Sequence, residues 1–165
     1  VDISGNFKLG ALGKLKISGQ GTYLTKATSS STRGGPLVSG LGNFNVFETP
    51  RVRGTLSGTW DYHGVSILTR YNYTGKWFVG DPVNGCFASP AQQAALGNCD
   101  VQPFATIDAG VTYTGIKNTT LSLLGRNVTG RDAPYDANQT TLGFNPTFHS
   151  PQGVNYVLTA AYRFK

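Results

Sequence analysis

Hydrophobic and polar residues alternate along seven segments of the chain, and this period of two predicts β-strands. Residues 51–62 are typical: Val52, Leu56 and Trp60 fall on one face with glycines between them, while Arg53 and Thr55 fall on the other. No long segment shows a helical period, so we expect an all-β fold. The predicted strands are residues 1–9, 14–26, 51–62, 65–76, 104–114, 118–127 and 153–164.

The connections between these strands alternate between short and long. The short ones are residues 10–13, 62–64 and 115–117, and the long ones are roughly residues 27–50, 77–103 and 128–152. In an antiparallel sheet, every short turn then lies at one end and every long loop at the other. Outer-membrane barrels show this asymmetry, with short periplasmic turns and long extracellular loops. The sequence therefore predicts an antiparallel transmembrane β-barrel segment of about seven strands.

Aromatic residues cluster near both ends of the predicted apolar face, with aliphatic residues and glycine between them. Two such belts are typical of a barrel that crosses a bilayer, because amphipathic rings favour the headgroup level. A soluble secreted β-sandwich that binds carbohydrate stays open as an alternative. The belt near the short turns has Phe7, Trp60, Tyr62, Tyr113, Tyr162 and Phe164, and the other has Tyr23, Tyr73, Trp77, Phe104 and Tyr156.

The composition and charge of the chain argue against several classes of protein. Charged residues make up 13% of the chain, about half the usual share of a soluble domain. The net charge is +6, but the basic residues form no run, so we expect no nucleic-acid binding. No stretch of about 18 apolar residues occurs, which excludes a membrane-spanning helix. The chain opens without Met or a signal peptide, so we expect a fragment or a processed product.

The two cysteines, Cys86 and Cys99, lie in the second long loop. Their spacing does not fit a CxxC metal or redox motif. We expect a loop disulfide and an oxidising compartment, while two free thiols remain the alternative.

Candidate chemistry is sparse. No nucleophile elbow, paired carboxylates or metal-ligand spacing around His63 or His149 is present, so we expect no enzyme activity, no metal and no cofactor. Loop aromatics could contact an apolar or planar ligand, or could only pack against neighbouring loops. These ligand-binding candidates are Phe44, Phe47, Trp77, Phe78, Tyr135, Phe144 and Phe148.

Several segments carry a family resemblance. The last strand places Tyr162 and Phe164 at alternate positions next to the C-terminus, which resembles the assembly signal of outer-membrane barrels, although Lys165 follows the aromatic. Residues 123–135 resemble a stretch near the end of TonB-dependent receptors, with matches at Arg126, Asn127, Pro134 and Tyr135. Ile107-Asp108 and the segments 15–26 and 50–60 resemble further patterns of the same family, in the same order.

The resemblance implies that residues 1–165 are the C-terminal portion of a barrel of about 22 strands with a plugged lumen. The plug domain and the remaining strands are absent from this chain. The family imports scarce solutes such as ferric siderophores across the bacterial outer membrane. The implied partners are outer-membrane lipid, the rest of the barrel, the plug, TonB acting through that plug, and the barrel assembly machinery. A passive porin-like channel is the second interpretation.

Overall fold

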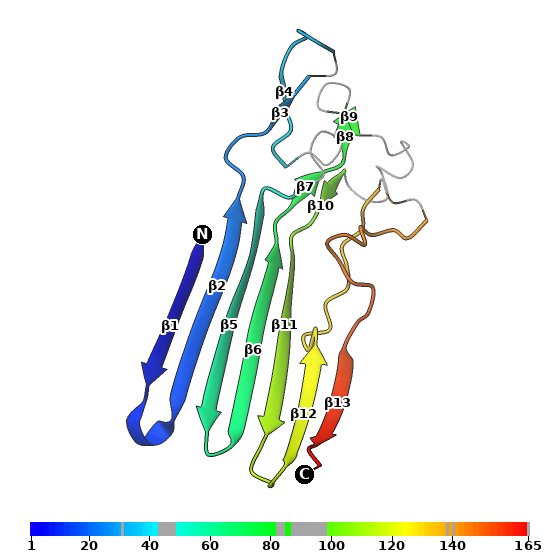
Figure 1. The fold of residues 1–165 in the computed structure, drawn as a ribbon. Coiled ribbons are helices and arrows are strands. Elements are labelled where there is room, and N and C mark those ends of the chain that lie inside the picture. Colours follow the sequence, from blue (N-terminus) through cyan, green and yellow to red (C-terminus); the bar gives the residue numbers. More distant parts are fainter. Residues whose placement is uncertain are drawn as a thin grey trace.

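The computed structural model describes residues 1–30, 32–42, 49–81, 85–86, 99–137, 139 and 141–164. Its main feature is one seven-stranded antiparallel sheet in which strands adjacent in sequence are also neighbours in space (Figure 1). The all-β antiparallel fold predicted from the alternation is therefore confirmed. The strands in spatial order are β1 (Asp2–Lys8), β2 (Lys14–Tyr23), β5 (Val52–Tyr62), β6 (Val65–Thr74), β11 (Phe104–Tyr113), β12 (Thr119–Arg126) and β13 (Asn155–Tyr162).

Strand register confirms the predicted alternation of faces. One row of paired residues crosses all seven strands on the same face, which we call the apolar face. The row consists of Phe7, Leu15, Trp60, Ile67, Val111, Leu123 and Leu158. On the opposite, polar face, a parallel row contains Ser4, Ser18, Ser57, Arg70 and Asp108.

The apolar face is open. The exposed fraction is 48% for Leu56 in the middle of the sheet and 76% for Leu158 on its last strand. A β-sandwich would cover this face with a second large sheet. Within the described ranges, the other sheets are three two-stranded ribbons, and Trp60 and Leu158 share one face instead of facing each other.

The two ends of the sheet differ as the connection lengths predict (Figure 1). At the short-turn end, β1 and β2 are joined through the 3-10 helix η1 (Gly10–Leu12), and β5 and β6 through the turn at His63 and Gly64. Both turn residues have positive φ, 43° and 79°, as a type I′ hairpin turn requires. The long-loop end carries the three small ribbons: β3 (Thr28–Ser29) with β4 (Val38–Ser39), β7 (Trp77–Phe78) with β10 (Asp100–Val101), and β8 (Gly80–Asp81) with β9 (Gly85–Cys86).

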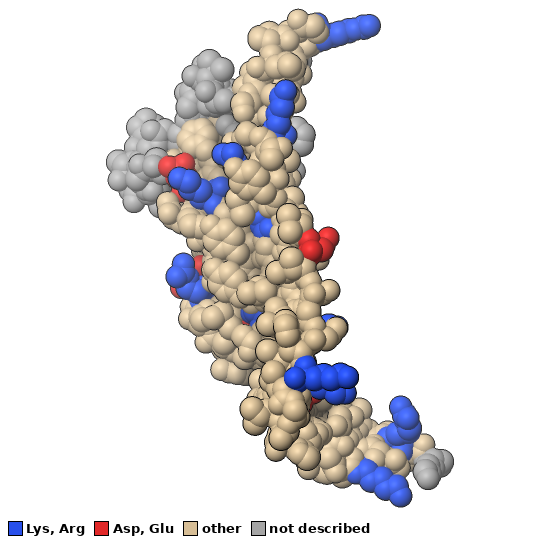
Figure 2. All heavy atoms as spheres, turned by 90° about the vertical axis from the view of Figure 1, so that its left-hand side faces the viewer, with Lys and Arg blue, Asp and Glu red and all other residues tan. Residues whose placement is uncertain are grey.

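The most deeply buried apolar residues lie outside the large sheet, at the long-loop end. Trp77, Val79, Cys99 and Val101 form a core cluster, against which Phe78, Ala137 and Phe148 pack. A helix long and apolar enough to cross a membrane is not found among the described residues. In Figure 2 the visible surface is mostly uncharged, and Lys and Arg side chains extend from both ends of the molecule and lie at several places between them.

Candidate functional site

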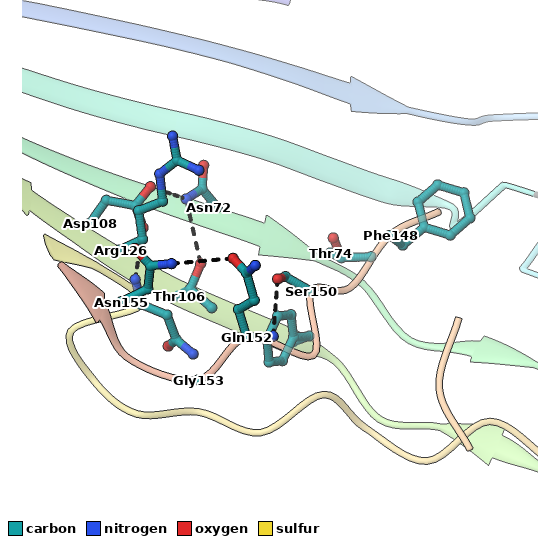
Figure 3. Close-up of a pocket in the computed structure, with 12 residues that line it drawn as sticks. Asn72, Thr74, Thr106, Asp108, Arg126, Phe148, Ser150, Gln152, Gly153 and Asn155 are labelled. Carbon is teal, nitrogen blue, oxygen red and sulfur yellow. Dashed lines mark hydrogen bonds between the residues drawn. The ribbon is translucent and has the colours of Figure 1, made fainter. Parts of the chain in front are cut away.

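A cavity of about 240 Å³ lies on the polar face, where the last loop (residues 127–154) folds back against the sheet (Figure 3). Its wall comes from β6, β11 and β12, and its cover comes from the end of the last loop. The residues that line it are Asn72, Thr74, Phe104, Thr106, Asp108, Arg126, Asn127, Phe148, Ser150, Gln152, Gly153 and Asn155.

Asp108 is the centre of the polar network in this cavity. The side-chain amide of Asn72 donates to Asp108 Oδ2 at 3.1 Å, and the backbone N–H of Asn127 donates to Asp108 Oδ1 at 2.9 Å. The carboxylate thus accepts from amide groups rather than from Arg70 or Arg126, which the alternation places on the same face. Hydrogen bonds to a charged group are among the stronger ones in proteins. Asp108 therefore fastens the start of the last loop to the sheet.

Asn127 shapes the turn that begins the last loop. Its φ is 49°, a left-handed conformation that Asn tolerates better than most residues. Its side-chain amide donates to the carbonyl of Arg131 at 2.8 Å, and its side-chain oxygen accepts from the backbone N–H of Arg131 at 3.1 Å. Both the nitrogen and the oxygen of the Asn127 side-chain amide take part in hydrogen bonds, and the residue is buried. The local fold at the cavity edge therefore depends on this side chain.

The other end of the last loop is held by rings. His149 stacks on Trp77 with a centroid distance of 5.1 Å and an interplanar angle of 12°, and it meets Phe104 edge-on at 4.9 Å. Next to it, Phe148 lies 5.9 Å from the Trp77 ring and under the Arg53 guanidinium, which is 4.7 Å from its centroid. We call these five side chains the aromatic clamp. It joins the last loop to β5, β7 and β11.

His149 is the most unusual residue of the clamp. It is 3% exposed, and neither imidazole nitrogen has a hydrogen-bond partner. Burial lowers the pKa of His149 from 6.5 to about 4, because the charged imidazolium would lose its hydration. The side chain is therefore neutral at pH 7 and packs as an aromatic ring.

The aromatic residues predicted from the sequence as ligand-binding candidates differ in how far the structure exposes them. Trp77 is 2% exposed within the core, whereas Tyr135 is 42% exposed. Phe78, Phe144 and Phe148 are half-buried, and of these only Phe148 lines the cavity. Phe44 and Phe47 lie outside the described residues. A role in ligand binding stays a prediction for all seven.

The other sequence candidates have the following environments. Cys99 is disulfide-bonded and 2% exposed. The Cys86 side chain lies outside the described part of the structure, so the pairing of these two cysteines stays a prediction. Tyr162 and Phe164 pack edge to face at 4.8 Å, and Phe164 is 85% exposed. An assembly signal needs such accessibility, but the role itself stays a prediction.

Sequence reasoning missed most of the polar lining of the cavity. Asn72, Thr106 and Gln152 carry no motif, and their proximity follows only from register and from the path of the last loop. Asp108 and Asn127 lie in segments that carry the family resemblance. No group of three or more metal-ligating side chains occurs in the described ranges.

The sheet order, the single apolar face and the sorted connections define an antiparallel sheet whose first and last strands are each paired on one side among the described strands. No protein-family model and no curated protein matches the sequence. Two variants of the ferric enterobactin receptor PfeA from Pseudomonas aeruginosa, a TonB-dependent receptor, match the structure with a TM-score of 0.59. Their identity is 21%, over 97% of this chain and 21% of the receptor.

PfeA in complex with BCV-L6 gives a TM-score of 0.58 at 21% identity, over 96% of this chain and 21% of the receptor. The chain therefore has the fold of part of such a receptor and spans about a fifth of its length. The matched structures are receptors, not enzymes.

Proposed function

We propose that this chain is the C-terminal portion of the β-barrel of a TonB-dependent outer-membrane receptor, which imports a scarce solute such as a ferric siderophore. One observation carries the proposal: the register aligns an exposed apolar face across all seven strands, with the short turns at one end. Lipid satisfies such a face, whereas water would leave it as a large exposed apolar patch.

The edges of the sheet support membership in a larger barrel. β1 and β13 are each paired on one side among the described strands. Unpaired edges are costly in lipid, where no water can satisfy the free N–H and C=O groups. The remaining strands of the barrel would pair with both edges, and the polar face would then line a lumen that holds the plug. TonB would act through that plug.

The choice of solute rests on the matched receptors and on the cavity. PfeA is a ferric enterobactin receptor, and the cavity at Asp108 lies on the polar face at the long-loop end, which would be the extracellular side. A passive porin-like channel would share the same sheet. The two proposals differ in their need for TonB.

Uptake in living cells tests the function. The complete gene would be expressed in a Gram-negative strain that lacks its own ferric siderophore receptors, and import of ⁵⁵Fe-labelled catecholate and hydroxamate siderophores would be measured with and without TonB. We expect import that disappears when TonB is deleted. Passage that persists without TonB would support the porin-like channel instead.

Membrane location is tested separately by fractionation of the same cells. We expect the protein in the outer-membrane fraction, where detergent is needed to extract it. Release into buffer without detergent would refute the barrel.

A further inference from the structure

The aromatic clamp has a feature that transport does not require. His149 is a titratable group buried where its charged form has no hydrogen-bond acceptor. Its ring lies between Trp77 and Phe104, and both nitrogens are without a hydrogen-bond partner. A Phe at this position would fill the same space without a group that titrates near neutral pH. The structure therefore combines tight packing with sensitivity to pH.

We propose that His149 is a pH-operated latch, which holds the last loop closed over the cavity when it is neutral and releases the loop when it is protonated. The geometry places the latch next to the cavity cover, because Phe148 and Ser150 on either side of His149 both line the cavity. Loss of the clamp would free residues 148–153, and the polar network around Asp108 would become open to solvent. This inference concerns the loop and does not depend on which solute the barrel carries.

The charged groups around the ring do not neutralise an imidazolium. Among the described residues, no carboxylate is hydrogen-bonded to the ring nitrogens. Asp108 accepts from Asn72 and Asn127, and Asp136 is fully buried with an interaction of its own, although its Oδ2 has no hydrogen-bond partner. Arg53 lies over the Phe148 ring and would repel a second positive charge. The charged side chains on the elements that the clamp joins are Arg53 and Asp61 on β5, Asp108 on β11, and Arg131, Asp132 and Asp136 in the last loop.

One interaction opposes release. A protonated imidazole stacked on Trp77 would gain a cation–π attraction. That gain is smaller than the hydration lost when a charge is buried without a hydrogen-bond acceptor. The direction of the pKa of His149 follows from burial, which disfavours the imidazolium.

The sign of the pH effect follows from the two pKa values of His149. The pKa is about 4 with the loop closed and 6.5 when the ring is free in water. The closed form is therefore fully favoured above pH 6.5, and it loses stability as the pH falls from 6.5 towards 4, where the free form binds the extra proton. Between pH 7.5 and pH 5, the population of the released loop should rise about 30-fold.

Hydrogen–deuterium exchange of the complete protein in detergent micelles tests the latch. The reporters are the backbone N–H groups of Phe148 and His149, which bond to the carbonyl of Asn145 within the last loop. After correction for intrinsic exchange chemistry, we expect their protection to fall about 30-fold at pH 5 relative to pH 7.5. Amides in β5 and β6 should keep their protection and serve as the internal reference.

The variant H149F isolates the titration from the packing. It keeps the aromatic contacts with Trp77 and Phe104 and loses no hydrogen bond of the ring, so we expect a closed loop at both pH values. H63Q is the matched control, because His63 is the other histidine of the chain and lies in a turn at the opposite end of the sheet. It should respond to pH like the wild-type protein.

Two results would overturn the latch. One is wild-type protection in the last loop that is equal at pH 7.5 and pH 5. The other is an H149F loop that still opens at pH 5, since another group would then control it. If H149F does not fold, the wild-type pH series with its internal reference decides the question, because a loop that stays closed at pH 5 excludes the proposal.

Discussion

Leu123 offers a direct test of what covers the apolar face. It lies in the middle of β12, its exposed fraction is 43%, and its partners across the sheet are Val111 and Leu158. The neighbouring Ser122 points to the polar face, opposite Thr112 and Thr159. Replacing each residue by Arg therefore places the same charge on opposite faces at nearly the same depth.

The expected cost depends on the solvent at each face. In a bilayer, Arg on the lipid-facing side near the midplane costs about 2–4 kcal/mol, so we expect about 3 kcal/mol for L123R. In water, the same change would cost about 1 kcal/mol or less, because Leu123 has only part of its surface to lose. S122R faces the polar side and should stay within about 0.5 kcal/mol.

The assay is reversible guanidinium unfolding of the complete protein in phosphatidylcholine vesicles, followed by tryptophan fluorescence. Heat-modifiable mobility in SDS gels reports independently whether the barrel has folded. L121R provides a depth check: Leu121 lies closer to the short turns, so its substitution should cost less than that of Leu123. Equal costs for L123R and S122R, or a larger cost for S122R, would refute the assignment of the apolar face to lipid.

Three further changes test local features. G13A should destabilise the first hairpin by about 1–3 kcal/mol in thermal unfolding, because φ is 90° and a Cβ would collide with the backbone carbonyl oxygen of Asp61. G10A, where a Cβ would meet open space, should cost less. D108A should lower the exchange protection of the Asn127 amide by about 1.5–3 kcal/mol. W77A should lower the free energy of unfolding of the long-loop end by about 3–5 kcal/mol. Limited proteolysis should then cleave this end faster than in the wild-type protein. An unchanged cleavage rate would contradict the core position of Trp77.

The large sheet could be predicted from the sequence because each strand carries its own signal. Val52, Leu56 and Trp60 alternate with polar residues, and the turn at His63 and Gly64 fixes the register of β5 against β6. The exceptions show the limits of alternation. Leu68 and Leu124 belong to the polar face by register, so apolar identity alone does not place a side chain.

The candidate site could be predicted only in part. Asp108 and Asn127 could be singled out because they belong to segments with a family resemblance, but their hydrogen bond could not. Trp77, Phe104 and His149 come from three segments far apart in the chain, and long loops have no period from which contacts can be deduced. The sequence places His63 in a short turn and His149 in the last long loop, but nothing in it shows that His149 is buried between aromatic rings.

The fold joins two parts that depend on different environments. The sheet has an open apolar face and, among the described strands, two singly paired edges, which lipid and further strands would cover in the proposed barrel. The long-loop end instead buries Trp77, Val79 and Val101 in a core of its own, which needs neither. Asp108 and the aromatic clamp are the attachments between the last loop and the sheet. A change of pH can therefore act on the loop through His149 while the sheet, whose strands carry no buried histidine among the described residues, keeps its register.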